Sequence, residues 1–223
     1  PDYVVVPNEL EEQLIARVVH EAQSMYPNIT ENEDYAGIIN ERHFARLQNY
    51  LDDAVAKGAK LTIVGANKTR ASAGNRRMPL HILQNVNDDM LVMQEEIFGP
   101  VLPFMTYSDV TEVPDMIEPR RSPLALYYFG KDKREQEYLL SHVQSGGVCI
   151  NDITLHYVQE DLPFGGFGAS GMGAYHGPEG FRSMSHARAI YSQTMIDVLP
   201  IVGARPPFGD KFRKNISKIL GAI

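Results

Sequence analysis

The stretch NERHFARLQNYLDDAVAKGAKLTIV, residues 40–64, has the pattern of a helix followed by a strand. Its first part repeats apolar side chains at the three- and four-residue spacing of one helical face. Asn40 is placed to cap the start of that helix, and Gly58 to end it in a left-handed turn. Residues 60–64 then read as a β-strand. A helix that is closed by a glycine and followed by a strand is the repeating unit of an α/β fold. The buried stripe of the helix would consist of Phe44, Leu47, Leu51 and Val55.

The same order returns later in the chain. Asp132, with Glu135 three residues on, is predicted to begin a helix that ends at two glycines, and residues 148–150 form the next strand. Residues 124–129 are a continuous apolar run between a proline and a glycine, which is typical of a central strand covered on both faces. We therefore expect an α/β fold with a largely parallel sheet flanked by helices.

The N-terminal residues predict a strand and then a further helix. Residues 3–6 are apolar, Asn8 is a candidate helix cap, and Glu11 stands three residues on, where its carboxylate can complete a capping box. Apolar side chains then recur on one helical face as far as Met25. The polar stretch of residues 67–77 is predicted to be an exposed loop.

Composition and charge narrow the class of protein. The chain has 223 residues, 43% hydrophobic, and its 21 basic and 28 acidic residues give a net charge of −7 without a basic stripe. Nucleic acid is therefore not an expected partner. Cys149 is the single cysteine, so no intrachain disulfide can form, and a reducing cytoplasm is the expected compartment. Because the first residue is Pro1 and an apolar strand follows it at once, we expect the natural protein to extend upstream.

The segment QEEIFGPV, residues 94–101, carries the strongest candidate chemistry. It places two carboxylates and an aromatic ring beside a glycine and a proline that favour a turn. An ionised carboxylate can accept hydrogen bonds from both hydroxyls of a ribose, and a phenyl face can pack against a nicotinamide. Adjacent glutamates more often form a solvated surface, so the chemistry alone does not decide between the two interpretations.

This segment resembles the Glu-Glu-x-Phe-Gly-Pro signature of the aldehyde dehydrogenases. Further matches to that family follow in order along the chain, at residues 1–4, 123–129, 162–166 and 170–171. The resemblance implies the fold of the family's catalytic domain, truncated in this sequence. Residues 1–183 would form the remainder of that domain, and residues 184–223 an oligomerisation strand and a C-terminal tail.

The resemblance also implies roles for individual residues. Glu96 matches the glutamate that holds the nicotinamide ribose, and Phe98 matches the phenylalanine that lies against the cofactor. Asn151 falls where family members carry an asparagine near the active site, and Phe164 and His156 are expected to border the substrate channel. The implied cofactor is NAD, with NADP as the alternative. No histidine pair has the spacing of metal ligands, so no metal site is expected.

The nucleophile is not expected within this chain. Cys149 lies between two β-branched residues of a predicted strand, where cysteine usually packs as a small buried hydrophobe. In the family that this chain resembles, the catalytic cysteine stands just before the Pro-Asp-Tyr segment, which here places it upstream of Pro1. The fragment alone is then expected to be inactive. Residues 166–171 match the spacing of a dinucleotide fingerprint, but no strand precedes them, and they are interpreted as a tight loop instead.

Finer strings point to a subgroup. Residues 171–177 resemble the class-three relatives, and residues 156–166 resemble bacterial coniferyl aldehyde dehydrogenases. This resemblance implies oxidation of a hydrophobic aromatic aldehyde to its acid through a cysteine thiohemiacetal. Two alternatives stay open, which are an acyl phosphate reductase of the same fold and a non-catalytic assembly module.

The C-terminal residues carry the predictions about assembly. A strand at residues 187–192 is expected to pair with another subunit in a homodimer or a larger homo-oligomer, as the resemblance implies. Residues 208–220 form an amphipathic pattern with a basic face. We expect this segment to dock on protein rather than to contact a membrane.

Overall fold

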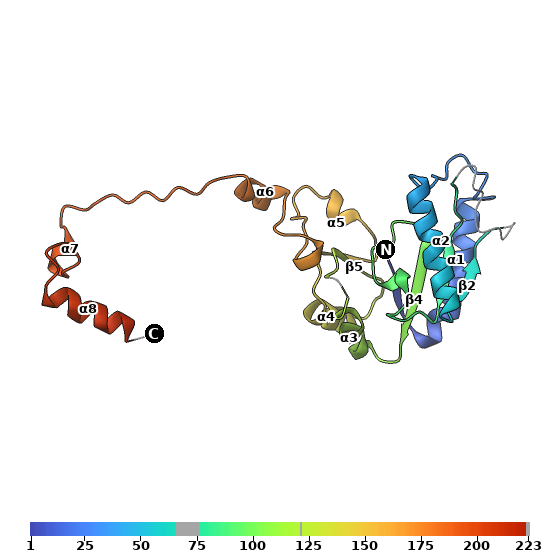
Figure 1. Cartoon of the computed structure of the whole chain (residues 1–223), viewed down its shortest axis with the longest axis horizontal. Coiled ribbons are helices and arrows are strands. Elements are labelled where there is room, and N and C mark those ends of the chain that lie inside the picture. The colour runs from blue at the N-terminus through green and yellow to red at the C-terminus, as the bar shows by residue number, and fades with distance from the viewer. Residues whose placement is uncertain (66–75, 121, 222–223) are drawn as a thin grey trace. The chain divides into compact units, whose positions relative to one another are not determined.

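The computed structural model describes residues 1–65, 76–120 and 122–221 of the chain. Most of the loop predicted at residues 67–77 lies outside the described residues. The chain divides into two compact units, Pro1–Gly180 and Phe181–Ile223. Figure 1 shows the order of the elements along the chain. That the two parts serve as a catalytic domain and an oligomerisation segment stays a prediction.

The first unit contains two sheets, and most of the strand pairs in them are parallel. In the larger sheet β1 pairs with β4 and β4 with β3 in parallel, while β3 pairs with β2 in antiparallel fashion. In the smaller sheet β5 and β6 are parallel. The expected α/β fold with a largely parallel sheet is confirmed. The strands are β1 (Val4–Pro7), β2 (Lys60–Ile63), β3 (His81–Gln84), β4 (Val101–Tyr107), β5 (Ala125–Tyr128) and β6 (Gly147–Ile150).

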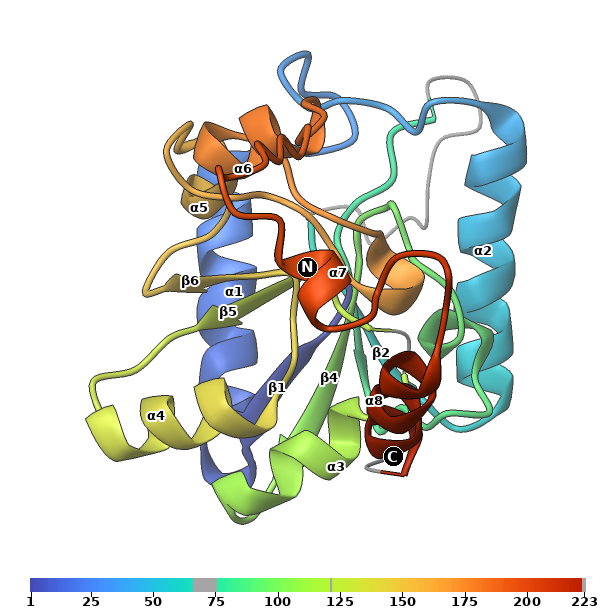
Figure 2. The same ribbon diagram turned by 90° about the vertical axis from the view of Figure 1, so that its left-hand side faces the viewer.

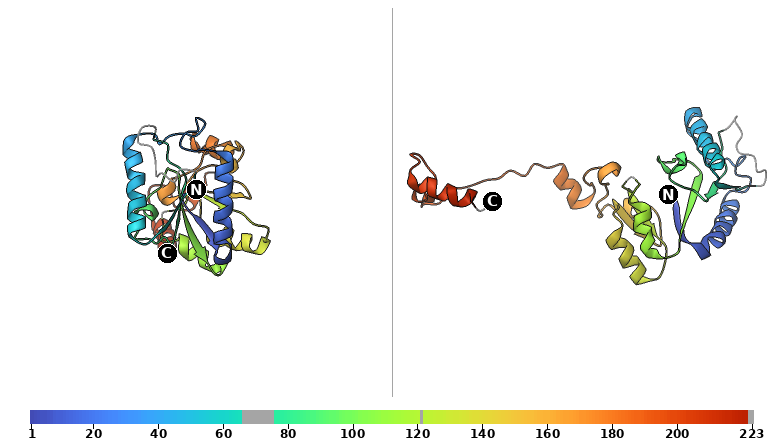
Figure 3. Two further views of the ribbon diagram at one scale, coloured as in Figure 1. Left: turned by 90° about the vertical axis from the view of Figure 1, so that its right-hand side faces the viewer. Right: turned by 60° about the horizontal axis from the view of Figure 1, so that its bottom comes forward.

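Two long helices cover opposite faces of the larger sheet. Helix α1 (Glu11–Met25) packs on the face to which Ile82 points, and α2 (Glu41–Ala56) packs on the face to which Leu83 points. Successive side chains of a strand alternate between the two faces of its sheet, so one strand serves both cores. Figure 2 and the left panel of Figure 3 show α1 and α2 standing on either side of β1 and β4.

Helix α2 begins and ends at the residues predicted from its sequence. The side chain of Asn40 accepts a hydrogen bond from the backbone N–H of His43 at 2.9 Å, which satisfies a donor that the helix leaves free. Gly58 takes a φ of +99° just beyond the end of the helix, a conformation that strains any residue with a Cβ. Leu47 and Leu51 are buried at 0% and 1% exposure. The predicted boundaries and buried stripe are confirmed, except that Val55 is 39% exposed.

The start of the N-terminal helix differs from the prediction. Asn8 does not cap it: the α-helix begins at Glu11 after a short 3-10 turn, η1 (Asn8–Leu10), and no side chain bonds to its first amides. The amide of Asn8 donates instead to Oγ of Ser108 at 2.7 Å, across 100 residues of sequence. A partner brought in by the fold has replaced the local one.

A third core lies between the two sheets. Helices α3 (Val113–Ile117) and α4 (Lys133–His142) contribute to it, together with Tyr128 of β5 and, at its margin, Val5 of β1. The side chain of Asp132 caps α4, as predicted, by accepting from the amides of Arg134 and Glu135. Strand β5 is not central in the described residues, because it pairs only with β6 and most of its side chains are half-buried.

Short elements complete the described chain, and they lie in loops or in the C-terminal part. In the second unit, Asn215 of α8 donates to the carbonyl of Val202 at 2.9 Å and so joins α8 to the turn after α7. The segment with the amphipathic pattern, residues 208–220, contains α8. Residues 186–194 form no strand within the chain, and the pairing predicted for them with another subunit stays a prediction. These elements are η2 (Leu91–Met93), η3 (Val110–Glu112), α5 (Leu155–Val158), η4 (Gly168–Ser170), α6 (Gly177–Ser183), α7 (Val198–Ile201) and α8 (Asp210–Leu220).

Candidate active site

The turn before β4 presents the two predicted cofactor residues outward. Ile97 is buried at 2% exposure in the core beneath α2, while its neighbours Glu96 and Phe98 face solvent, Phe98 with 74% of its surface exposed. Phe98 adopts a φ of +46°, which is uncommon for a residue with a side chain. A single buried anchor thus displays a carboxylate on one side and a phenyl ring on the other.

Helix α2 holds this turn with side chains that sequence reasoning missed. The guanidinium of Arg46 donates to the carbonyl of Glu96 at 3.1 Å and to the carbonyl of Ile97 at 2.6 Å. It also donates to the hydroxyl of Tyr50 at 2.9 Å, and that hydroxyl donates to the carboxylate of Glu95 at 2.9 Å. Hydrogen bonds from a charged donor are stronger than those between neutral groups. The two side chains therefore fix the backbone of the turn against α2.

The turn is also in contact with the segment before β1 and with Leu47 of α2. The N–H of Ile97 donates to the carboxylate of Asp2 at 3.0 Å, so the segment before β1 is bonded to the turn. Partial desolvation of the Glu96 carboxyl raises its pKa, and the nearby charge of Asp2 raises it further. At Gly99, an added Cβ would stand 2.7 Å from Cδ2 of Leu47, so a side chain at this position would force Leu47 to shift.

The predicted channel residues Phe164 and His156 lie together in a cluster of rings. The centroid of the Phe164 ring is 5.9 Å from that of His156, 5.3 Å from that of Tyr157 and 5.6 Å from that of Tyr175. Phe164 and Tyr175 also exchange two backbone hydrogen bonds of 2.9 Å. These distances are those of ring pairs in contact, so the cluster offers an aromatic surface.

Histidine nitrogens in this cluster lack hydrogen-bond partners among the described residues. Both ring nitrogens of His156, and Nδ1 of His176, are buried without a partner there. Buried polar atoms in folded proteins are nearly always bonded, so these three nitrogens are exceptions within the described residues. The His156 ring packs over Gly147 of β6, where an added Cβ would stand 2.7 Å from its Cδ2.

Asn151 is fixed at the joint between β5 and β6. Its side-chain oxygen accepts from the N–H of Gly130 at 2.9 Å, and its amide nitrogen donates to the carbonyl of Gly130 at 3.0 Å. Its own N–H donates to the carbonyl of Tyr128 at 2.7 Å, and its φ is +56°. Through these hydrogen bonds Asn151 connects the residues that follow β5 and β6. Its place near the active site stays a prediction.

The remaining predicted features have simple structural roles. Cys149 is buried at 9% exposure within β6, as predicted for a packed thiol. Residues 166–171 form a tight loop around η4, where an added Cβ at Gly166 would stand 2.6 Å from Oγ of Ser170. No strand leads into this loop, so it is not a dinucleotide fingerprint. Within the described residues, no group of three or more histidine, cysteine, aspartate or glutamate side chains is arranged to hold a metal.

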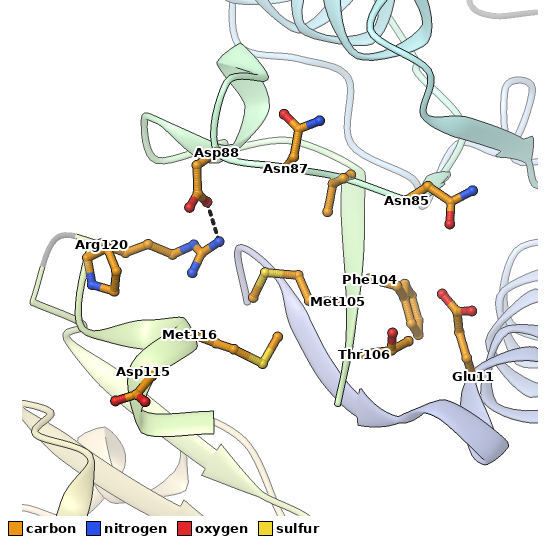
Figure 4. A pocket seen from close by; sticks show the side chains of 12 residues that line it. Glu11, Asn85, Asn87, Asp88, Phe104, Met105, Thr106, Asp115, Met116 and Arg120 are labelled. Atoms are coloured by element: carbon orange, nitrogen blue, oxygen red, sulfur yellow. Dashed lines mark hydrogen bonds and ion pairs between the residues drawn. The ribbon is translucent and has the colours of Figure 1, made fainter. Parts of the chain in front are cut away.

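A surface pocket lies away from these residues. It is formed by the loop after β3, the middle of β4 and the residues around α3, and none of the predicted site residues lines it. Figure 4 shows the ion pair of Asp88 and Arg120 at one side, with Met105 and Met116 across from it. The structure assigns no chemistry to this pocket.

The sequence profile described as the aldehyde dehydrogenase family matches residues 1–190. A probable coniferyl aldehyde dehydrogenase of Caulobacter vibrioides is 43% identical over 218 residues, covering 97% of this chain and 45% of that protein. The coniferyl aldehyde dehydrogenase of a Pseudomonas species is 41% identical, covering 99% of this chain and 46% of that protein.

A solved structure supports the fold directly. The substrate-bound state of AldH from Staphylococcus aureus matches with a TM-score of 0.78 at 32% identity, covering 98% of this chain and 46% of that one. The chain therefore spans less than half the length of these relatives. In the described part of the chain, no helix has the length and apolar character needed to cross a membrane.

Proposed function

The chain belongs to the aldehyde dehydrogenase family, and from this premise we propose that the whole protein oxidises an aldehyde to its carboxylic acid with NAD or NADP. The observation that supports this proposal is the turn that displays Glu96 and Phe98 from a buried, hydrogen-bonded base. The proposed compartment is a reducing cytoplasm, in keeping with a single buried thiol.

The displayed side chains suit the nicotinamide end of the cofactor. The ionised carboxylate of Glu96 can accept from two ribose hydroxyls, and the exposed ring of Phe98 can pack against a flat group beside them. Arg46 and Asp2 are hydrogen-bonded to the backbone of the turn, so the Cα positions of Glu96 and Phe98 are fixed. Their task is to orient the cofactor, which is a matter of position rather than of acid or base chemistry.

The chemical step needs a nucleophile that the described residues do not offer. Cys149 is buried within a strand, so we propose a cysteine upstream of Pro1 as the attacking thiolate. The thiolate adds to the carbonyl carbon and gives a thiohemiacetal. The cofactor, when bound, would supply the acceptor for the hydride of this adduct, and water would then release the carboxylic acid.

The proposed substrate is a hydrophobic aromatic aldehyde of the coniferyl type. Phe164, Tyr157 and Tyr175 provide ring faces that suit a flat apolar substrate. We propose that His156, whose ring centroid lies 5.9 Å from that of Phe164, borders the substrate channel beside these rings. Two relatives with 43% and 41% identity carry the name coniferyl aldehyde dehydrogenase.

We also propose that the protein works as a homo-oligomer joined through residues 187–192.

Steady-state kinetics of the whole protein test the role of Glu96. Glu96→Gln should lower kcat more than it raises KM for the cofactor, because a mispositioned nicotinamide slows the chemical step. Glu95→Gln is the matched control, since the side chain of Glu95 is directed to Tyr50 and should tolerate the change. An unchanged kcat in Glu96→Gln contradicts the assignment. A requirement for phosphate would indicate an acyl phosphate reductase, and cofactor binding without turnover a non-catalytic module.

A further inference from the structure

The carboxylate of Asp2 reaches the cofactor turn from the far end of the sequence. It accepts the N–H of Ile97 at 3.0 Å, a contact between residues 95 positions apart. The side chain of Ile97 is buried at 2% exposure beneath α2. Asp2 is therefore bonded to the residue of the turn whose side chain is buried.

Asp2 is itself held by its neighbours in sequence. Strand β1 begins two residues later and is locked in register, with Val4 opposite Phe104 of β4. The ring of Tyr3 lies under the guanidinium of Arg120, 5.6 Å from the ring centroid to Cζ. With these two ties, the backbone around Asp2 has little freedom to follow the turn if the turn moves.

The turn is thus fixed at one residue from two directions. The carboxylate of Asp2 accepts a hydrogen bond from the N–H of Ile97. The guanidinium of Arg46, on α2, donates to the carbonyl of the same Ile97 at 2.6 Å. The peptide groups on both sides of the buried side chain are held, and with them the directions in which Glu96 and Phe98 leave the backbone. Errors of about 1 Å in the position of a reacting group can slow a reaction on the order of 100-fold.

We propose that Asp2 is a positioning residue that couples the segment before β1 to the cofactor turn. The proposal rests on the function proposed above, in which that segment leads from the nucleophile. Asp2 would then set the distance between the carbon held by the thiolate and the nicotinamide oriented by Glu96 and Phe98. It touches neither substrate nor cofactor in this role.

The hydrogen bond, not the charge, should carry the effect. Asp2 stands near a second carboxylate, Glu96, and the two negative charges repel each other. An asparagine at position 2 keeps the oxygen that accepts from Ile97 and removes the repulsion. Asp2→Asn should therefore preserve the tie, whereas Asp2→Ala should break it.

The test compares these two variants in the whole protein, with Asp115→Ala, a change of an exposed carboxylate on α3, as the control. Asp2→Ala should lower kcat for aldehyde oxidation by about 10- to 100-fold while KM for the cofactor changes by about twofold or less. Asp2→Asn should restore kcat, and it also shows that the fold tolerates a change at this position. An unchanged kcat in Asp2→Ala overturns the proposal, as does an equal loss in both variants.

Hydrogen exchange at the amide of Ile97 gives a readout that does not depend on activity. Asp2→Ala should speed that exchange, and Asp2→Asn should leave it as in the wild type. If the wild type oxidises no aldehyde, the proposed function fails. Hydrogen exchange still tests whether Asp2 holds the amide of Ile97. Faster exchange in Asp2→Ala then supports the tie, and unchanged protection overturns it.

Discussion

Gly99→Ala should destabilise the protein through one contact. An added Cβ would meet Cδ1 and Cδ2 of Leu47, with Cδ2 at 2.7 Å, which is closer than a Cβ packs against another carbon. Leu47 is fully buried at 0% exposure in the core beneath α2, so its side chain has no open space to enter. Overpacking of this kind costs about 1–3 kcal/mol of unfolding free energy.

A double-mutant cycle isolates that contact. Leu47→Ala alone should cost about 2–5 kcal/mol, because it leaves a cavity in a packed core. With both changes present, the new methyl group enters the vacated space, so the combined loss should fall short of the sum by about 1–2 kcal/mol. Urea unfolding followed by circular dichroism measures all four corners of the cycle, with the slope of each transition checked for constancy.

The control for this cycle is Gly209→Ala. An added Cβ there meets no atom within 4 Å, so the unfolding free energy should change by about 0.5 kcal/mol or less. Strict additivity of Gly99→Ala and Leu47→Ala, or a neutral Gly99→Ala, would refute the packing argument.

Three further predictions concern titration and the strand joint. Since partial burial and Asp2 raise the pKa of Glu96, kcat should begin to fall with falling pH earlier than an ordinary glutamate would allow; Asp2→Asn should shift that limb of the kcat profile to lower pH. Burial raises the pKa of Tyr128 from 10.0 to about 12, so this residue's contribution to stability is complete below pH 10 and is lost as pH rises to about 12; Tyr128→Phe should flatten that part of the unfolding profile. Asn151→Ala should cost about 1–3 kcal/mol in urea unfolding, because it removes two hydrogen bonds to Gly130 and places alanine at a φ of +56°, whereas Asn151→Gly should cost less.

Local signals in the sequence were enough for much of the fold. The cap at Asn40 and the left-handed turn at Gly58 depend only on neighbouring residues, and both were predicted. Asn8 has the same capping chemistry, but the fold gives it a partner 100 residues away. Strand β5 was expected to be central because its residues are apolar, yet its neighbours depend on how the strands pair. Long-range pairing is therefore what the sequence did not disclose.

The same division holds at the candidate site. Glu96 and Phe98 could be proposed from the sequence because they stand in one short motif. Arg46 was missed because the carbonyls that it binds lie 50 and 51 residues further along, although its position four residues before Tyr50 on one helix face was a usable signal. Asp2 gave no local signal, since its contact spans 95 residues.

The most direct test of the proposed function is the formation of NADH or NADPH by the whole protein, measured with coniferyl aldehyde beside a long-chain aliphatic and a small polar aldehyde. We predict turnover with the highest kcat/KM for the aromatic substrate. A folded, cofactor-binding protein that oxidises none of the three aldehydes would contradict the proposed function.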